Sequence, residues 1–295
     1  MLFSDFVELY KNTVDKRLRE HTIQTRNYRI KNRIMPYFAD MRLRDIDAKA
    51  IATWHNELIS KGLSAGYIRN LHRNLSAIFN HATRFYGLRD NPCHKAGLPS
   101  VANEQKKEMR FWSLEEYQTA IECVTDLKAK AAIALLYWSG MRKGELLALT
   151  WGKLNTKDGT IKIDRSFQRL KGRDVITPTK TGNIRTIIIP KQALDLLAEY
   201  KSHCFDTGPA DVIFPWEKCF IEHGIAEACQ ASGVKRIHVH GLRHSHASLL
   251  IQQGVNIVLI SKRLGHAKVS MTLDTYSHFF PTEENDVVAK LSMLG

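Results

Sequence analysis

The stretch VHGLRHSHASLL, residues 239–250, carries three histidines and an arginine on a segment that we expect to be helical. His240 and His244 are four positions apart, so a helix places them on one face. Arg243 is three positions after His240 and shares that face. The segment therefore predicts a helix that presents imidazole and guanidinium groups together.

Two kinds of site use such a face. The spacing of His240 and His244 is that of a zinc-binding helix. However, no Glu follows His240, the cationic Arg243 lies between the two histidines, and no Cys or carboxylate supplies the missing ligands. A guanidinium fits two oxygens of a phosphate instead. The residues therefore disfavour a zinc site, and simple helix packing stays open for His244 and His246.

The composition indicates a polyanionic partner. The 295 residues carry 43 Lys and Arg against 30 Asp and Glu, a net charge of +13, and the pI is near 9.5. Such a charge favours nucleic acid most simply, although ribosome-associated or membrane-surface proteins can look similar. With 44% hydrophobic residues the chain can build a real core. The longest apolar run, residues 131–140, is about half as long as the ~20 residues that a membrane span needs. The residues after Met1 do not have the charged and then apolar pattern of a leader sequence. We expect an intracellular protein.

The cysteines give no sign of a disulfide framework or a metal site. Their number is odd and none forms a CxxC pair, which favours reduced thiols in a cytosol. The five are Cys93, Cys123, Cys204, Cys219 and Cys229.

The first third of the chain predicts a basic helical domain. Residues 1–100 hold 17 Lys and Arg against 9 Asp and Glu, so the charge per residue is higher here than in the rest. No strand pattern interrupts the helical spacing. Every predicted helix carries Lys or Arg, which favours a surface that faces DNA or RNA over a merely solvated one. The helices are expected to begin at the cap Ser4, to cover 21–38, to run from Asp47 to Leu58, and to run from Ser64 to near Gly87. The candidate DNA contacts are Arg26, Arg29, Lys31, Arg33, Arg69 and Arg73.

A second domain follows a break in the pattern. Prolines, glycine-type breakers and a cluster of charges predict a linker over residues 91–110. Ser113 then caps a helix, with acidic residues in its first turn. A buried helix ends at Gly140, and two strands, 159–164 and 183–190, flank a stretch rich in Gly and Lys. The remaining predicted helices cover 191–202, 216–232, 240–253 and 256–264, a short segment from Ser270, and an amphipathic segment at 282–294. The fold class is thus mainly α with a small β-sheet.

Three further segments carry single polar residues that mean little alone. SGMRKGELLALTW, residues 139–151, places Arg142 at a helix start, where anions bind, although pairing with Glu145 would explain it equally. In TPTKTGNIRTI, residues 177–187, Lys180 is expected at a hairpin tip, where it can donate a proton.

The last of these segments is RLGHAKVSMTLDTYSHFF, residues 263–280. Gly265 stops a helix and leaves His266 in a loop, and Tyr276 follows ten residues later on a short helix. An ordinary buried tyrosine would explain Tyr276 equally well. The order R…K…HxxR…GH…Y of all four segments, however, resembles the tyrosine recombinase (phage integrase) family.

The resemblance covers about residues 110–280, with 1–90 similar to the family's helical core-DNA-binding domain. HGLRHSHASLL and LGHAKVSMTLDTYSH look most like integrases of Gram-positive prophages and integrative conjugative elements. The resemblance implies two domains: a helical core-DNA-binding domain, 1–90, and an α+β catalytic domain, 111–295, which ends in the amphipathic helix 282–294. This helix could dock on a neighbouring copy or on its own domain.

Roles follow from the resemblance, residue by residue. Tyr276 would be the nucleophile, forming a 3′-phosphotyrosine and freeing a 5′-hydroxyl without ATP. Arg142 and Arg243 would hold the non-bridging oxygens and stabilise the charge of the transition state, so that no metal is required. The resemblance therefore implies no cofactor.

The other residues of the pattern would support this step. Lys180 would protonate the leaving 5′-oxygen, His240 would assist proton transfer at the tyrosine, and His266 would hydrogen-bond the phosphate. Glu145 would brace a neighbouring catalytic residue or its helix start. His244 lies outside the family's catalytic set, and we expect a structural role for it.

The resemblance also implies partners and leaves rivals. We expect a cytoplasmic, nucleoid-associated recombinase that integrates and excises a mobile element, closes around double-stranded DNA, and forms a homo-tetramer in synapsis, with accessory excision or bending factors. An Xer-type dimer resolvase, a type IB topoisomerase and a non-catalytic DNA-binding protein are the alternatives, although the last would be expected to lack a Tyr, Arg or Lys of the pattern. Integrases of this subgroup usually carry an amino-terminal arm-binding domain before the core-binding helices, so arm-site binding stays open.

Overall fold

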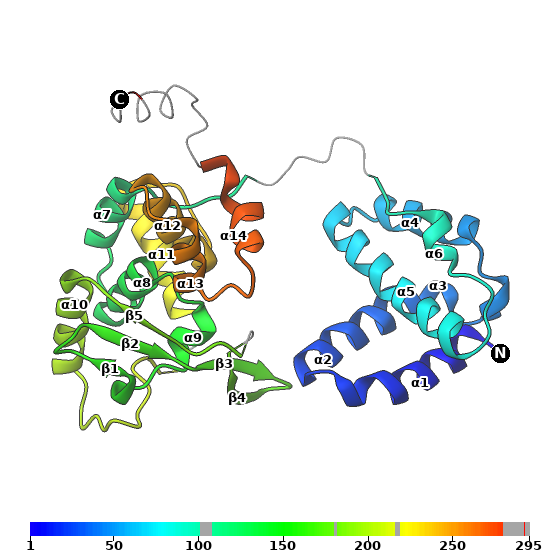
Figure 1. Ribbon diagram of the computed structural model, residues 1–295, viewed down its shortest axis with the longest axis horizontal. Coiled ribbons are helices and arrows are strands. Elements are labelled where there is room, and N and C mark those ends of the chain that lie inside the picture. The colour runs from blue at the N-terminus through cyan, green and yellow to red at the C-terminus, as the bar shows by residue number, and fades with distance from the viewer. Residues whose placement is uncertain (101–107, 180–181, 216–218, 280–291, 293–295) are drawn as a thin grey trace. The chain divides into compact units, whose positions relative to one another are not determined.

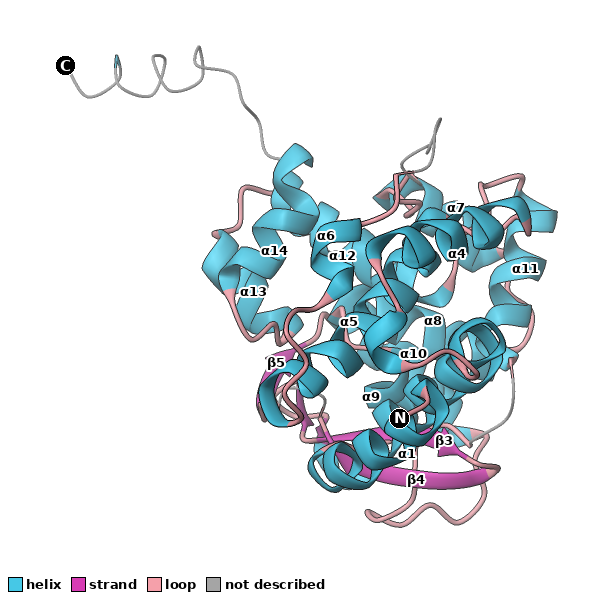
Figure 2. Cartoon of the chain, turned by 90° about the vertical axis from the view of Figure 1, so that its right-hand side faces the viewer, coloured by secondary structure: helices cyan, strands magenta, loops and turns pink. Residues whose placement is uncertain are grey.

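A computed structural model describes residues 1–100, 108–179, 182–215, 219–279 and 292 of the chain. The chain forms two compact units, Met1–Lys107 and Glu108–Gly295 (Figure 1). Helices make up most of both units, and the strands are confined to the second (Figure 2). The predicted class, mainly α with a small β-sheet, is confirmed. We describe each unit by itself.

The N-terminal unit is helical, as predicted. Its largest buried side chains come from several helices and meet in one core, with Trp54 donating its indole N–H to the Arg33 carbonyl oxygen at 3.0 Å. The predicted caps Asp47 and Ser64 are confirmed, whereas α1 begins one residue before Ser4. The helices are α1 (Phe3–Val14), α2 (Glu20–Arg29), α3 (Met35–Phe38), α4 (Ala48–Ser60), α5 (Ala65–Phe85) and α6 (Pro92–Ala96), with short 3-10 turns at Asp15–Arg17 and Leu43–Asp45.

The predicted helix 21–38 contains a change of helical geometry. A π-helical turn, Ile30–Ile34, joins α2 to α3. Ile30 and Ile34 are both fully buried, so the wider turn still directs its two isoleucines into the core. Such turns are rare and insert an extra residue into a helix without ending it.

Helix α6 lies inside the segment 91–110 that the sequence predicted as a linker. Pro92 and Cys93 are buried, and α6 packs against α4 and α5. The Asn91 side chain accepts a hydrogen bond from the Cys93 backbone N–H at 2.9 Å and so caps the helix. The start of the predicted linker therefore belongs to the N-terminal unit.

The second unit is built around α8, Leu127–Ser139. Most of its side chains are buried, because α10, α11 and α12 all pack against it. Ser113 caps α7 with a full capping box, as predicted. The other helices are α7 (Leu114–Glu122), α9 (Lys143–Leu147), α10 (Lys191–Ser202), α11 (Phe220–Ser232), α12 (Val239–Gln252), α13 (Ile257–Leu264) and α14 (Val269–Tyr276), with 3-10 turns at Trp151–Lys153 and Ser277–Phe279.

A three-stranded antiparallel sheet covers one side of these helices (Figure 1). Its order is β1 (Leu154–Asn155), β2 (Thr160–Ile163) and β5 (Arg185–Ile188). The register pairs Ile161 with Ile187, and both side chains are buried. The two predicted strands are thus confirmed as β2 and β5.

A β-hairpin between these strands was not predicted. It consists of β3 (Arg165–Leu170) and β4 (Arg173–Pro178), which pair only with each other. Most of its side chains are partly or fully exposed. The sequence therefore lacks the regular alternation of apolar and polar residues that predicts a half-buried strand. Its turn residues Lys171 and Gly172 both have positive φ angles, 49° and 80°, as in a type I′ turn.

Gly140 ends α8 in the left-handed conformation, with φ at 65°. A Cβ atom at this position would lie 2.5 Å from Cδ2 of the buried His246 and 2.9 Å from a methyl group of Leu264. Glycine is therefore required both by the backbone conformation and by the close approach of α12 and α13.

We predict that Gly140→Ala destabilises the second unit by about 3 kcal/mol, from backbone strain together with overpacking. Gly254→Ala is the matched control, because Gly254 has φ at 70° with nothing within 4 Å of the new Cβ. It should cost only about 1 kcal/mol. Urea denaturation measures both, and equal losses would contradict the steric argument.

Candidate active site

The structure brings most of the predicted site residues together from separate elements. Arg142 is the N-cap residue of α9, and His240 and Arg243 lie on α12. His266 follows α13 in a turn that begins at Gly265, whose left-handed conformation ends that helix as predicted. Tyr276 is the last residue of α14. The sixth predicted residue, Lys180, lies outside the described residues.

Glu145 is the buried centre of the arginine cluster, with 2% of its surface exposed. Its carboxylate accepts hydrogen bonds from the Arg142 backbone N–H and guanidinium, both at 2.9 Å, and from Arg185 at 2.6 and 3.2 Å. Burial works to raise the pKa of Glu145, but the hydrogen bonds and charges of Arg185 and Arg142 hold it below its usual range. The carboxylate is thus an anion at neutral pH, and it orients two cations.

Arg185 was not predicted as a site residue. It lies on β5, and its Nε donates to the Arg263 carbonyl oxygen at 2.9 Å. A Cβ atom at position 265 would lie 2.7 Å from Nη1 of Arg185, so the glycine at this position also leaves space for the Arg185 guanidinium. Because Arg142 Nη2 reaches the Gly265 carbonyl oxygen at 3.4 Å, both arginines tie the His266 turn to Glu145.

Arg243 is almost fully buried beneath the cluster. Its Nη1 donates to the Gly140 carbonyl oxygen at 2.7 Å, whereas its buried Nη2 has no hydrogen-bond partner in the described structure. Burial and the nearby charge of Arg142 lower the pKa of Arg243 to about 9, so it remains a cation at neutral pH. A buried cation with an unsatisfied donor is suited to bind an anion.

Tyr276 presents its hydroxyl group to a histidine. The ring is 1% exposed and packs in an apolar cluster with Ile260 and Leu264. Its hydroxyl oxygen lies 2.8 Å from Nδ1 of His244. Burial raises the pKa of Tyr276 to about 12, although the charge of Arg243 opposes this. The phenol is therefore protonated at rest.

His240 and His266 complete the cluster. His240 is exposed, and its ring packs edge-on against that of His244, with 4.8 Å between the ring centroids. Nδ1 of His266 lies 2.7 Å from the hydroxyl of the buried Thr272. Burial, followed by the charges of Arg243 and Arg142, lowers the pKa of His266 to about 4, so its ring is neutral. The pKa of His240 is lowered too, by the protein atoms that displace water from one side of its ring and then by the charges of Arg243 and Arg142.

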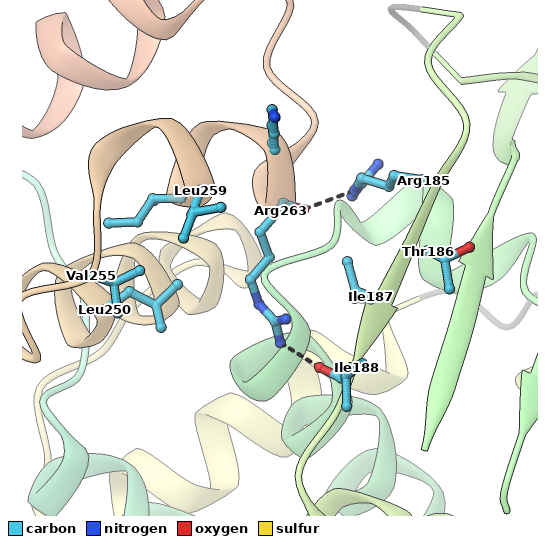
Figure 3. Close-up of a pocket in the computed structure, with 10 residues that line it drawn as sticks. Arg185, Thr186, Ile187, Ile188, Leu250, Val255, Leu259 and Arg263 are labelled. Carbon is cyan, nitrogen blue, oxygen red and sulfur yellow. Dashed lines mark hydrogen bonds between the residues drawn. The ribbon is translucent and has the colours of Figure 1, made fainter. Parts of the chain in front are cut away.

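A groove borders the site along the free edge of β5 (Figure 3). Apolar side chains of β5, α12 and α13 line it, together with Arg263, and its volume is about 480 Å³. Arg263 donates to the Ile188 and Trp138 carbonyl oxygens at 2.9 and 3.0 Å and to Nε2 of the buried His246 at 2.9 Å. This arginine therefore fastens the end of α13, and with it the His266 turn, to the sheet. The role left open for His246 is thus structural.

One predicted DNA contact lies mostly inside the N-terminal unit. Arg26 is 6% exposed, forms an ion pair with Asp15, and lies over the Tyr10 ring at 5.1 Å from its centroid. These contacts give Arg26 a structural role within the unit, and its contact with DNA stays a prediction. The basic spacing of the sequence could not distinguish it from its neighbours.

The other five predicted DNA contacts are at least partly accessible. Lys31 and Arg73 are exposed, and Arg29, Arg33 and Arg69 are half-buried. Arg69 and Arg73 are four residues apart on α5 and share a face. Their contact with DNA stays a prediction, as does the docking of helix 282–294, most of which lies outside the described residues.

The chemistry of the site follows from its charges. The protonated Tyr276 hydroxyl contacts a neutral histidine, and Arg142 and Arg243 lie in the same cluster. A phenol oxygen can act as a nucleophile, and guanidinium groups can bind an anion. Among the described residues, no group of three His, Cys, Asp or Glu side chains could hold a metal ion. The arrangement fits transfer of a phosphoryl group from an oxygen ester to tyrosine.

Comparison with known sequences identifies this arrangement. Residues 111–283 match the Phage integrase family, and residues 2–59 match its N-terminal SAM-like domain. The chain belongs to the phage integrase family. The ICEBs1 integrase of Bacillus subtilis (strain 168) is 30% identical over 99% of this chain and 83% of its own length. A XerC-like tyrosine recombinase of Caldanaerobacter subterraneus subsp. tengcongensis is 26% identical over 86% of this chain and 73% of its own.

Solved structures of integrases share the fold. The Tn1549 transposon integrase in complex with a circular intermediate DNA has a TM-score of 0.83 at 17% identity, over 98% of this chain and 99% of that one. A lambda integrase tetramer bound to a Holliday junction has a TM-score of 0.69 at 20% identity, over 95% and 78%. The predicted resemblance to mobile-element integrases of Gram-positive bacteria is confirmed. Within the described part of the chain, no helix has both the length and the apolar character to cross a bilayer.

We predict that Glu145→Gln lowers the stability of the second unit by about 3 kcal/mol at pH 7, because two arginines lose a buried counter-charge. Since the folded pKa of Glu145 lies below its unfolded value, near 4.3, this stabilisation is present above that pH and is lost as the pH falls through the folded pKa. The difference between variant and wild type should therefore shrink in acid.

Thermal unfolding between pH 3 and pH 7 measures this difference. Asp195→Asn, which removes an exposed ion pair with Lys191 in the same unit, is the control and should change stability by less than about 1 kcal/mol. If the loss of stability in Glu145→Gln did not depend on pH, the negative charge of the carboxylate would not be what stabilises the unit.

Proposed function

We propose that this chain is a site-specific recombinase that cleaves and rejoins duplex DNA through a 3′-phosphotyrosine intermediate, and so integrates and excises a mobile element. The observation that carries the proposal is the placement of the Tyr276 hydroxyl beside the buried Arg243, with Arg142 in the same cluster. A nucleophile and an anion clamp in one site are what phosphoryl transfer requires.

Cleavage begins with attack of the Tyr276 oxygen on a backbone phosphorus. The new bond joins Oη to phosphorus, and the bond from phosphorus to the 5′-oxygen breaks. Arg243 offers its unpartnered Nη2 to a non-bridging oxygen, and Arg142 offers a second guanidinium that Glu145 orients. One phosphate ester bond is exchanged for another, so rejoining requires no ATP. The two arginines stabilise the charge that a metal would otherwise stabilise.

Two further residues act on the same phosphate. Lys180 protonates the leaving 5′-oxygen, since an alkoxide is a poor leaving group without a proton. His266 donates a hydrogen bond to a non-bridging oxygen, and its contact with Thr272 orients the ring. The packing of His240 against His244 supports a place for both rings next to the nucleophile.

A mobile-element integrase is favoured over an Xer-type resolvase. The ICEBs1 integrase aligns with nearly the whole chain at higher identity than the XerC-like recombinase. A non-catalytic DNA-binding protein would not need a tyrosine hydroxyl held beside an arginine clamp. The Xer-type activity remains the second candidate, because it uses the same chemistry on sites that resolve dimers.

The remaining parts of the proposal concern DNA and assembly. The basic N-terminal unit binds the core site, with Lys31 and Arg73 as its exposed candidates. By analogy with the lambda integrase tetramer, the chain forms a homo-tetramer on paired sites in the nucleoid, in the cytoplasm, assisted by excision or bending factors. Binding should weaken steeply with salt, as it does for proteins that displace counterions from phosphates.

We predict that the wild-type chain forms a covalent complex with nicked suicide duplexes that carry the junction sequences of the element that encodes it, with EDTA present. A denaturing gel detects the complex. Tyr276→Phe should abolish it and keep duplex binding, since only the attacking oxygen is removed. A complex that persists in Tyr276→Phe would refute the assigned nucleophile, and loss of all complex in EDTA would refute the metal-free step.

The role of Lys180 has a separate test. Lys180→Ala should slow covalent complex formation by about 100-fold or more on an ordinary duplex. A duplex with sulfur in place of the bridging 5′-oxygen should restore the rate, because a thiol has a pKa near 8.5 and its thiolate leaves without a proton. Equal slowing on both duplexes would exclude Lys180 as the general acid.

A further inference from the structure

The sequence assigned proton transfer at the tyrosine to His240 and a structural role to His244. The structure places these two histidines differently. Nδ1 of His244 lies 2.8 Å from the Tyr276 oxygen, whereas the described hydrogen bonds include none between His240 and that oxygen. The ring of His240 instead packs edge-on against His244, on the exposed side. The nucleophilic oxygen thus has a direct histidine partner that the expected catalytic set omits.

We propose that His244 is a catalytic residue that accepts the proton of the Tyr276 hydroxyl during DNA cleavage and returns it during rejoining. This inference rests on the proposed function, because it names a group for the same reaction. It replaces the assignment of that proton transfer to His240.

The placement of His244 suits an acceptor. The ring is neutral, because burial, followed by the charges of His240 and Arg243, lowers the pKa of His244 to about 4. A neutral imidazole with its proton on Nε2 has a free lone pair on Nδ1, and the protonated phenol donates to it at this distance. His244 is on α12 and Tyr276 is on α14, so the contact joins two helices that must both be in place.

Bound DNA would make His244 a stronger base. The groups that face it are His240, Arg243 and Tyr276, and the cation Arg243 opposes protonation of the ring. A phosphate held by Arg243 and Arg142 would offset these positive charges and so raise the proton affinity of His244, and that of the Tyr276 oxygen with it. The proton therefore moves to His244 as the new bond to phosphorus forms, because the tyrosine oxygen then passes its negative charge to the phosphate.

The proton balance of the step is complete. The Oη–H proton moves to Nδ1 of His244, the Oη–P bond forms, the P–O5′ bond breaks, and the 5′-oxygen takes a proton from Lys180. Rejoining reverses each transfer. The 5′-hydroxyl attacks phosphorus and gives its proton to the Lys180 amine, and the His244 imidazolium returns its proton to the tyrosine oxygen.

The test compares His244→Ala and His244→Asn in the covalent-complex assay on the suicide duplexes. Asn is the sharper variant, because its side-chain oxygen can accept a hydrogen bond near the position of Nδ1 but cannot take a proton at neutral pH. His223→Asn is the control, because His223 is exposed on α11 and has no described side-chain contact. Melting temperature and duplex binding establish that each variant is folded.

We expect both His244 variants to form the complex about 100-fold more slowly than the wild type, the usual contribution of a general base. His223→Asn should match the wild type. Added imidazole should raise the rate of folded His244→Ala several-fold and leave Tyr276→Phe inactive. Replacing the bridging 5′-oxygen by sulfur should not restore the rate of either His244 variant, because these variants lack the group that accepts the tyrosine proton and keep the group that protonates the leaving oxygen.

Three results would overturn the proposal. A rate for His244→Asn close to that of the wild type would mean that hydrogen bonding alone suffices. Slow His244→Ala that imidazole does not accelerate would mean a packing role. If the 5′-sulfur duplex restored the rate of the His244 variants, His244 would act on the leaving oxygen and not on the tyrosine. If the wild type itself forms no complex, the proposed function fails, and this outcome is distinct from the other three, in which the wild type is active.

Discussion

The ion cluster around Glu145 is the constraint on which the rest of the site depends. A carboxylate that is 2% exposed must be compensated, and Arg142 and Arg185 do so from a helix start and a strand. Because Arg185 also holds the Arg263 carbonyl oxygen, the same cluster fixes the turn that carries His266. A buried pair of this kind contributes little net stability, but it leaves few alternative arrangements. We interpret it as the element that orients the cations.

The proposed nucleophile, Tyr276, rests in a protonated state. Its ring is packed among apolar side chains, its hydroxyl is protonated, and its histidine neighbour is neutral because burial and positive charges oppose protonation. In the proposed reaction, a phosphate bound by Arg243 and Arg142 offsets the positive charges around His244 and so favours proton transfer to that ring as the tyrosine oxygen attacks.

The sequence predicted the fold class, most of the helix boundaries and the residues that meet around the tyrosine. Helix caps such as Ser113 and stops such as Gly140 are local signals, so they could be read directly. The β3–β4 hairpin was missed because its exposed faces lack apolar alternation. Arg185 and His244 were missed for a different reason: their partners are 40 and 32 residues away, and only the packing of separate elements brings them together. The ion pair of Arg26 with Asp15 was not predicted either, because basic spacing does not reveal which arginines pair within their own unit.

Many of the contacts that aim the site's cations end on main-chain carbonyl oxygens. Arg243 holds that of Gly140, Arg185 that of Arg263, and Arg263 itself holds those of Trp138 and Ile188. A carbonyl group is present whatever side chain its residue carries, so mutation can replace many of the neighbours without removing an acceptor. The site can therefore keep its geometry while the surrounding sequence drifts.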